Sequence, residues 1–151
     1  MPALSRALVV IVAFGLAGQA TAGRDLVKFP ENFAEGVRYA IVPRGDIRQE
    51  LYTSRAAVEA AKQGRALPSG TVITLVDYRD GKLYRYVVME KRAGWGGKYA
   101  PDMRNGEWEY QAFNADKSVN RNDNVARCFA CHKSQEAQDF VFTHERMKGV
   151  K

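Results

Sequence analysis

Two cysteines and a histidine stand close together near the end of the chain, in the segment Cys128-Phe129-Ala130-Cys131-His132. This C-x-x-C-H pattern is typical of the covalent attachment of a c-type haem. On a helix, positions i, i+3 and i+4 share one face, so both thiols and the imidazole would project together. The thiols can then form thioethers with the two vinyl groups of one haem, and His132 can bind its iron.

Other uses of this cysteine pair fit the sequence less well. A thioredoxin-like pair would precede a helix within a βαβ unit, and that pattern is absent. A zinc site needs four ligands, and the spacing of His144 from the pair matches no zinc finger. The chain has 2 cysteines in all, so a framework of disulfides between distant segments is excluded as well.

A second axial ligand would distinguish an electron carrier from a protein that binds small molecules at the iron. His144 falls in a charged tail and is expected at the surface, whereas the apolar setting of Met89 predicts a core residue. Met103 falls in a polar loop and Met147 in the tail. None of the four is well placed, so the sequence favours an open or weakly occupied sixth position.

The N-terminus has the layout of a secretory signal peptide. Arg6 precedes an apolar stretch over residues 7–18, and Ala20-Thr21-Ala22 forms a small-x-small cleavage site. The apolar stretch is shorter than the roughly 20 residues that a membrane-spanning helix needs. We therefore predict a signal peptide over residues 1–22, export to the periplasm, and one domain over 23–151 with no membrane span.

The chain is basic, with 23 Lys and Arg against 17 Asp and Glu and a formal net charge of +6. The basic residues are scattered and form no run, which argues against a nucleic-acid partner. A solvated basic surface is the simpler interpretation. Such a surface could also help docking to an acidic redox partner protein.

A β-hairpin is the strongest local signal. The stretches Thr71–Arg79 and Leu83–Lys91 are rich in β-branched and apolar residues, and Asp80-Gly81 between them favours a type I′ turn. A two-residue turn without irregularities would set Ile73 opposite Val88. Both faces of this hairpin are largely apolar, so each is expected to pack on the core, the haem or a partner subunit.

The remaining elements complete an α+β fold. Strands are expected over Val37–Val42, Ile47–Tyr52 and Glu107–Phe113, and an Ala-rich helix over Arg55–Gln63. Thr53 or Ser54 can cap that helix, and Gly64 ends it. Asn124 can cap a short helix over Val125–Lys133. The prediction is an antiparallel β-sheet with one central helix and a short C-terminal haem-attachment helix.

Four further segments occur in a fixed order around the motif: 67–72 (LPSGTV), 89–96 (MEKRAGWG), 107–110 (EWEY) and 139–142 (DFVF). Together with C-x-x-C-H they resemble the cytochrome P460 family, whose close relatives are the cytochromes c′-beta. The resemblance implies a mostly antiparallel sheet, often in a homodimer, and a five-coordinate haem held by His132.

The family divides by chemistry. The cytochromes P460 oxidise hydroxylamine and have a lysine bonded to the haem, whereas the c′-beta proteins lack that bond and bind nitric oxide or carbon monoxide between phenylalanines. The resemblance places the lysine on the strand entering the hairpin, but Thr71–Arg79 contains none. The nearest are Lys82 and Lys91. The ammonium of Lys91 is expected in water, because burying it unpaired is costly.

One carboxylate and five phenylalanines are further candidates for the ligand-binding pocket at the haem. Glu90 is a candidate distal proton acceptor, although an exposed charge at the strand end is the simpler interpretation. The phenylalanines that could wall a gas-binding pocket are Phe29, Phe33, Phe113, Phe140 and Phe142.

The leading hypothesis is a periplasmic haem protein that binds nitric oxide or similar small ligands at an open iron. The alternatives are an enzyme that oxidises hydroxylamine or nitric oxide, and a simple electron carrier with Met or His as sixth ligand.

Overall fold

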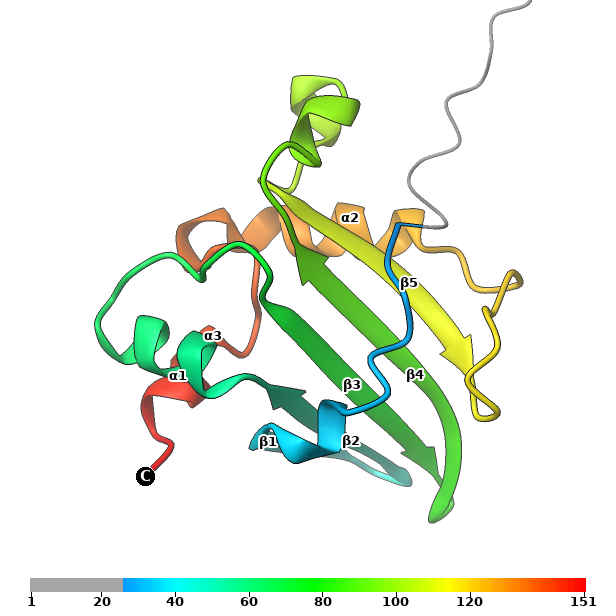
Figure 1. Ribbon diagram of the computed structural model, residues 1–151. Coiled ribbons are helices and arrows are strands. Elements are labelled where there is room, and N and C mark those ends of the chain that lie inside the picture. The colour runs from blue at the N-terminus through cyan, green and yellow to red at the C-terminus, as the bar shows by residue number, and fades with distance from the viewer. Residues whose placement is uncertain (1–25) are drawn as a thin grey trace, which may run out of the picture.

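Five strands form a single antiparallel sheet in the computed structural model, which describes residues 26–151 (Figure 1). In sheet order they are β1 (Val37–Arg44), β2 (Ile47–Thr53), β3 (Val72–Arg79), β4 (Lys82–Lys91) and β5 (Trp108–Asn114). The helices are α1 (Arg55–Lys62), α2 (Ala126–His132) and α3 (His144–Lys148). Short 3₁₀ turns are η1 (Phe33–Glu35), η2 (Gly96–Lys98), η3 (Pro101–Met103) and η4 (Lys133–Gln138). The predicted α+β fold is confirmed.

Each strand pairs with the next one along the chain, so the sheet is a meander. The strand β1 continues two residues past its predicted end, through Pro43 and Arg44. Proline is tolerated there because β1 is an edge strand, where a missing N–H leaves no ladder bond unmade. Within the described residues, no helix is long and apolar enough to cross a membrane. The predicted signal peptide, 1–22, lies outside those residues.

The β3–β4 hairpin contains an irregularity that the sequence did not reveal. Asp80 and Gly81 both have positive φ (48° and 72°), as a type I′ turn requires. Beside the turn Tyr78 pairs with Leu83, but the next residue, Asp77, pairs with Arg85. The skipped residue, Tyr84, is a β-bulge.

The predicted register is therefore wrong beyond this bulge. Ile73 lies opposite Met89, and Leu75 lies opposite Val87. A one-residue slip moves every later side chain to the other face. Met89 consequently shares a face with Ile73, whereas Glu90 lies on the opposite one.

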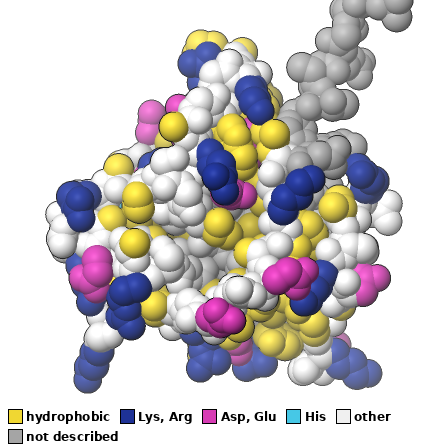
Figure 2. All heavy atoms as spheres, in the orientation of Figure 1, with side chains coloured by type: hydrophobic (Ala, Val, Ile, Leu, Met, Phe, Trp, Pro, Cys, Tyr) yellow, Lys and Arg dark blue, Asp and Glu magenta, His cyan; other side chains and the backbone are white. Residues whose placement is uncertain are grey.

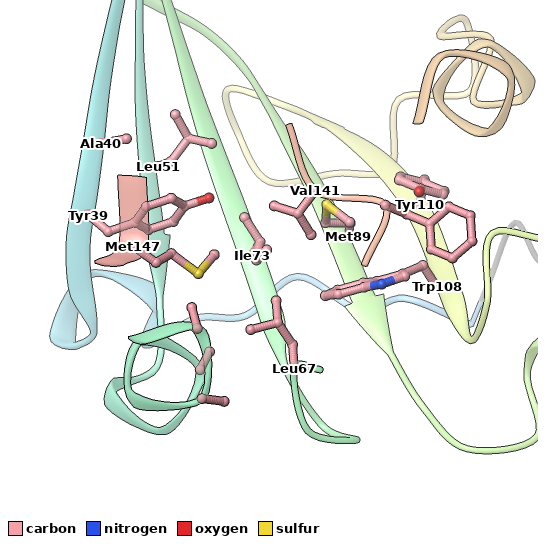
Figure 3. Packing of buried hydrophobic residues seen from close by; sticks show 14 of the residues in the cluster. Tyr39, Ala40, Leu51, Leu67, Ile73, Met89, Trp108, Tyr110, Val141 and Met147 are labelled. Atoms are coloured by element: carbon pink, nitrogen blue, oxygen red, sulfur yellow. The ribbon is translucent and has the colours of Figure 1, made fainter. Parts of the chain in front are cut away.

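Both faces of the sheet are packed, as expected from the apolar residues on both faces of the hairpin. The helix-side face, marked by Leu51, Ile73, Met89 and Tyr110, packs against the helices and the C-terminal segment (Figure 3). The opposite face packs against residues 26–36, which cross it in Figure 1. Its cluster contains Val27, Val76, Tyr86, Val88 and Phe113.

The predicted central helix is confirmed as α1. The Oγ of Ser54 accepts a hydrogen bond from the N–H of Ala57 at 3.2 Å, and Gly64 follows the helix with φ +66°. Ala57, Ala60 and Ala61 are buried against α3, a helix that the sequence did not predict. On the face shown in Figure 2, the Lys and Arg side chains are scattered among acidic and apolar ones.

Candidate functional site

The helix α2 carries the C-x-x-C-H motif and is fixed to the sheet by Phe129, one of the two residues between the cysteines. Phe129 is buried, and its ring lies 4.8 Å from that of Tyr110 and 5.2 Å from that of Tyr99. Asn124 accepts a hydrogen bond from the N–H of Ala126 at 3.2 Å, close to the predicted start of the helix. Phe129 is therefore a buried anchor of the helix, and Cys128 packs as a partly buried residue against the same core.

Both thiols of the motif are free. Cys128 is half-buried and Cys131 is exposed. Burial raises the pKa of Cys128 to about 11, so this thiol stays protonated near neutral pH.

The imidazole of His132 is held in a single orientation. Its Nδ1 lies 2.6 Å from the backbone oxygen of Phe140. A carbonyl oxygen only accepts hydrogen bonds, so Nδ1 carries the proton and donates it. Burial lowers the pKa of His132 and favours the neutral ring. A neutral imidazole whose Nδ1–H is bound in this way presents its Nε2 lone pair to a metal.

His132 lines a cavity of about 170 Å³ on the helix-side face. The imidazole lies between the rings of Tyr110 and Phe142, at 5.0 and 5.1 Å. Most of the other lining side chains are aliphatic: Val42, Leu51, Ile73, Leu75, Val87, Met89 and Val141. The polar side chains on its wall are Arg44, Gln49 and Thr143.

These residues fit a haem. An apolar wall suits the flat macrocycle, and the exposed Arg44 suits the propionates at its edge. The His132 imidazole would supply a nitrogen ligand to the iron, and Cys128 and Cys131, which do not line the cavity, would supply the attachment points from the same helix. A larger groove of about 490 Å³ lies beside residues 30–36, but no motif residue lines it.

The candidate sixth ligands are separated by the fold. Met89 lines the cavity, whereas Met103 is exposed and Met147 is buried against α1. His144 was expected at the surface, and this expectation is wrong, because α3 turns its ring inward to 7% exposure. Neither His144 nor Met147 lines the cavity.

Glu90 is 6% exposed, so the expectation of an exposed charge is wrong, and it does not reach the cavity that His132 lines. It lies on the opposite face of the sheet, across from Glu109 on β5, and accepts a hydrogen bond from Arg92 at 2.5 Å. The five candidate phenylalanines are also divided. Phe142 lines the cavity, Phe140 is buried in the helix-side core, and the other three pack on the opposite face: Phe29, Phe33 and Phe113.

Lys91 was expected to keep its ammonium in water, and this expectation is wrong. Its side chain is 13% exposed, and its Nζ donates to both carboxylate oxygens of Asp139, at 2.7 and 2.9 Å. Asp139 follows Lys91 by 48 residues. A sequence pattern shows no such pairing, although both residues fall in the segments that carry the family resemblance.

A second ionic group beside the motif was not foreseen. The Asp77 carboxylate is 1% exposed and accepts from Nε of Arg85 at 3.2 Å. Arg85 also donates to Asp123, in the loop that leads into α2. These two carboxylates raise the pKa of Arg85. The group ties the start of the motif helix to β4.

Comparison with known families matches residues 39–143 to the model of cytochrome P460. The matched range runs from β1 to Thr143 on the cavity wall, and includes every residue of the C-x-x-C-H motif. A comparison with curated proteins found no match.

Proposed function

Because the chain belongs to the cytochrome P460 family, we propose that it is a periplasmic c-type haem protein that binds small ligands such as nitric oxide. The observation that carries this proposal is His132, whose Nδ1 is bound to Phe140 and whose ring lines an apolar cavity. When bound, a haem supplies an iron that takes an exogenous ligand wherever its sixth position is free.

An open sixth position is supported by the cavity wall. Of the four candidate ligands from the sequence, Met89 alone lines the cavity. Met89 also belongs to the buried core between Ile73 and Tyr110, where it fills space. The aliphatic side chains around it offer the iron no strong ligand, so a small apolar molecule would meet little competition.

Attachment by two thioethers and no lysine bond is the second part of the proposal. No lysine lines the cavity, and Lys91 is bound to Asp139. This arrangement favours a ligand-binding protein over an enzyme that oxidises hydroxylamine. The periplasmic location rests on the predicted signal peptide, and a homodimer is proposed on the family resemblance. Light scattering of the purified protein would measure the oligomeric state.

Haem should remain on the wild-type protein through acid–acetone extraction, because two thioethers join it to α2. The pyridine haemochrome spectrum should be of the two-thioether type. In Cys131→Ala and in Cys128→Ala the spectrum should shift to that of a single thioether. Loss of the haem from the wild-type protein during extraction would contradict the proposed attachment.

Replacing Met89 with Leu should leave the ferrous iron high-spin, as in the wild type. The two side chains have similar volumes, so the core should tolerate the change at a cost below about 1.5 kcal/mol. The measurements are the ferrous absorption spectrum and nitric oxide titration, with Met103→Leu as an exposed control. If the ferrous iron were low-spin in the wild type and high-spin in Met89→Leu, Met89 would be the sixth ligand. That result would support an electron carrier instead.

Turnover of hydroxylamine should be weak. The same protein would be assayed with an artificial electron acceptor, and its haem peptides would be analysed by mass spectrometry. A third covalent link to any lysine, with turnover lost when that lysine is replaced, would support the enzyme instead.

A further inference from the structure

The segment that follows the motif helix contains an unusual turn. Asp139 and Phe140 both have positive φ, at 53° and 62°. Aspartate tolerates this left-handed region, but a bulky residue such as Phe140 is rarely found there. Two such residues in succession persist only where surrounding contacts hold them. The carbonyl of this strained Phe140 accepts the hydrogen bond from His132.

The carboxylate of Asp139 provides much of that support. It accepts from Lys91 on β4 at 2.7 and 2.9 Å, and from the backbone N–H of Leu67 at 2.9 Å. The indole N–H of Trp108 on β5 approaches it to 3.4 Å. Three separate segments therefore fix one side chain. Lys91 and Asp139 are 13% and 15% exposed, so water screens their attraction less than that of a surface pair.

Phe140 is held from its other side. Its N–H donates to the backbone oxygen of Gln135 at 2.7 Å. Its ring packs on Gly106 so closely that a Cβ there would come within 3.0 Å of the ring. With both residues fixed, the Phe140 carbonyl keeps its direction toward Nδ1 of His132.

We propose that the Lys91–Asp139 pair is a positioning device for the axial ligand of the haem. The pair holds the turn, the turn aims the Phe140 carbonyl, and the carbonyl fixes the orientation of the His132 ring. A strong Nδ1–H···O bond also makes the imidazole a more basic ligand, which stabilises ferric iron and lowers the reduction potential. This inference rests on His132 as an iron ligand, and not on which molecule binds opposite it.

The test compares two variants of the haem-loaded protein with two controls. Lys91→Met removes the ammonium while keeping a long apolar stem. Asp139→Asn removes the carboxylate charge, and asparagine tolerates a left-handed backbone. Lys91→Arg, which keeps the charge, is the rescue variant. Lys117→Met removes an exposed ion pair with Glu31 and serves as the matched control.

We expect Lys91→Met and Asp139→Asn to raise the reduction potential, so that the ratio of ferrous to ferric protein at a fixed potential increases several-fold. A tenfold increase corresponds to 59 mV for one electron. The iron–histidine stretching frequency of the ferrous protein should fall. In Lys91→Arg the reduction potential and the stretching frequency should both stay close to their wild-type values. Lys117→Met should change neither quantity.

If both variants kept the wild-type reduction potential and iron–histidine stretching frequency, and only their melting temperature fell, the inference would be overturned. The ion pair would then have a purely structural role. A six-coordinate, low-spin wild type would count against the proposed ligand binding. The potential shift could still be measured in that protein, so the two failures are distinguishable.

Discussion

Replacing His132 with glycine should abolish the native haem spectrum while the haem stays covalently bound through Cys128 and Cys131. The imidazole is the proposed iron ligand and lies on the cavity wall, and glycine would offer the iron no replacement. Free imidazole should restore a histidine-like spectrum, since the space between the rings of Tyr110 and Phe142 would then accommodate it. Absorption spectra during an imidazole titration would follow this recovery.

The matched control is the other histidine of the chain. His144 is also buried, but it lies on α3 and does not line the cavity. His144→Gln should therefore keep the wild-type spectrum and the nitric oxide affinity of the wild type. If His144→Gln changed the spin state and His132→Gly did not, the assignment of the axial ligand would be wrong.

The parts of the fold that sequence analysis predicted correctly are those with local signals. Asp80-Gly81 between two strands favours a tight turn, and Ser54 and Gly64 mark the ends of α1. The motif itself requires a helix with three side chains on one face. Each of these signals acts within a few residues, so it can be read without knowing what packs nearby.

The errors arose where the outcome depends on distant contacts. The bulge at Tyr84 is invisible in a pattern of alternating apolar residues, yet it decides which face Met89 and Glu90 occupy. The expectation for His144 failed because a five-residue helix with charged residues has little periodicity of its own. That helix forms because Met147 is buried against α1.

The site was predictable to the same extent. The two thiols and the imidazole fall within five consecutive residues, so the motif identifies them as candidates without any knowledge of the fold. The cavity wall comes from all five strands, the end of α2 and the C-terminal segment, so its composition depends on the register. The strands contribute mostly aliphatic side chains to the wall. Of the five candidate phenylalanines, only Phe142 lines it. The role of Asp139 requires segments around residues 67, 91 and 108 to meet.

The residue expected to matter most for stability is Trp108. It is 1% exposed and lies in the helix-side core between Val141 and Leu67 (Figure 3). Its ring also lies 5.8 Å from the ammonium of Lys91, and its N–H points to Asp139. Trp108→Ala should lower the free energy of unfolding by about 3–5 kcal/mol, because a large buried ring leaves a cavity that neighbours fill only partly.

Such a loss is a large share of the 5–15 kcal/mol typical of a small domain, so it would be measured by urea unfolding at low temperature. Trp95→Ala is the matched control, since Trp95 is half-buried and packs at the margin of the opposite face. It should cost about 1–2 kcal/mol, in proportion to the smaller apolar area that it buries. Equal losses in the two variants would contradict this packing, because they would mean that Trp108 contributes no more than a partly exposed ring.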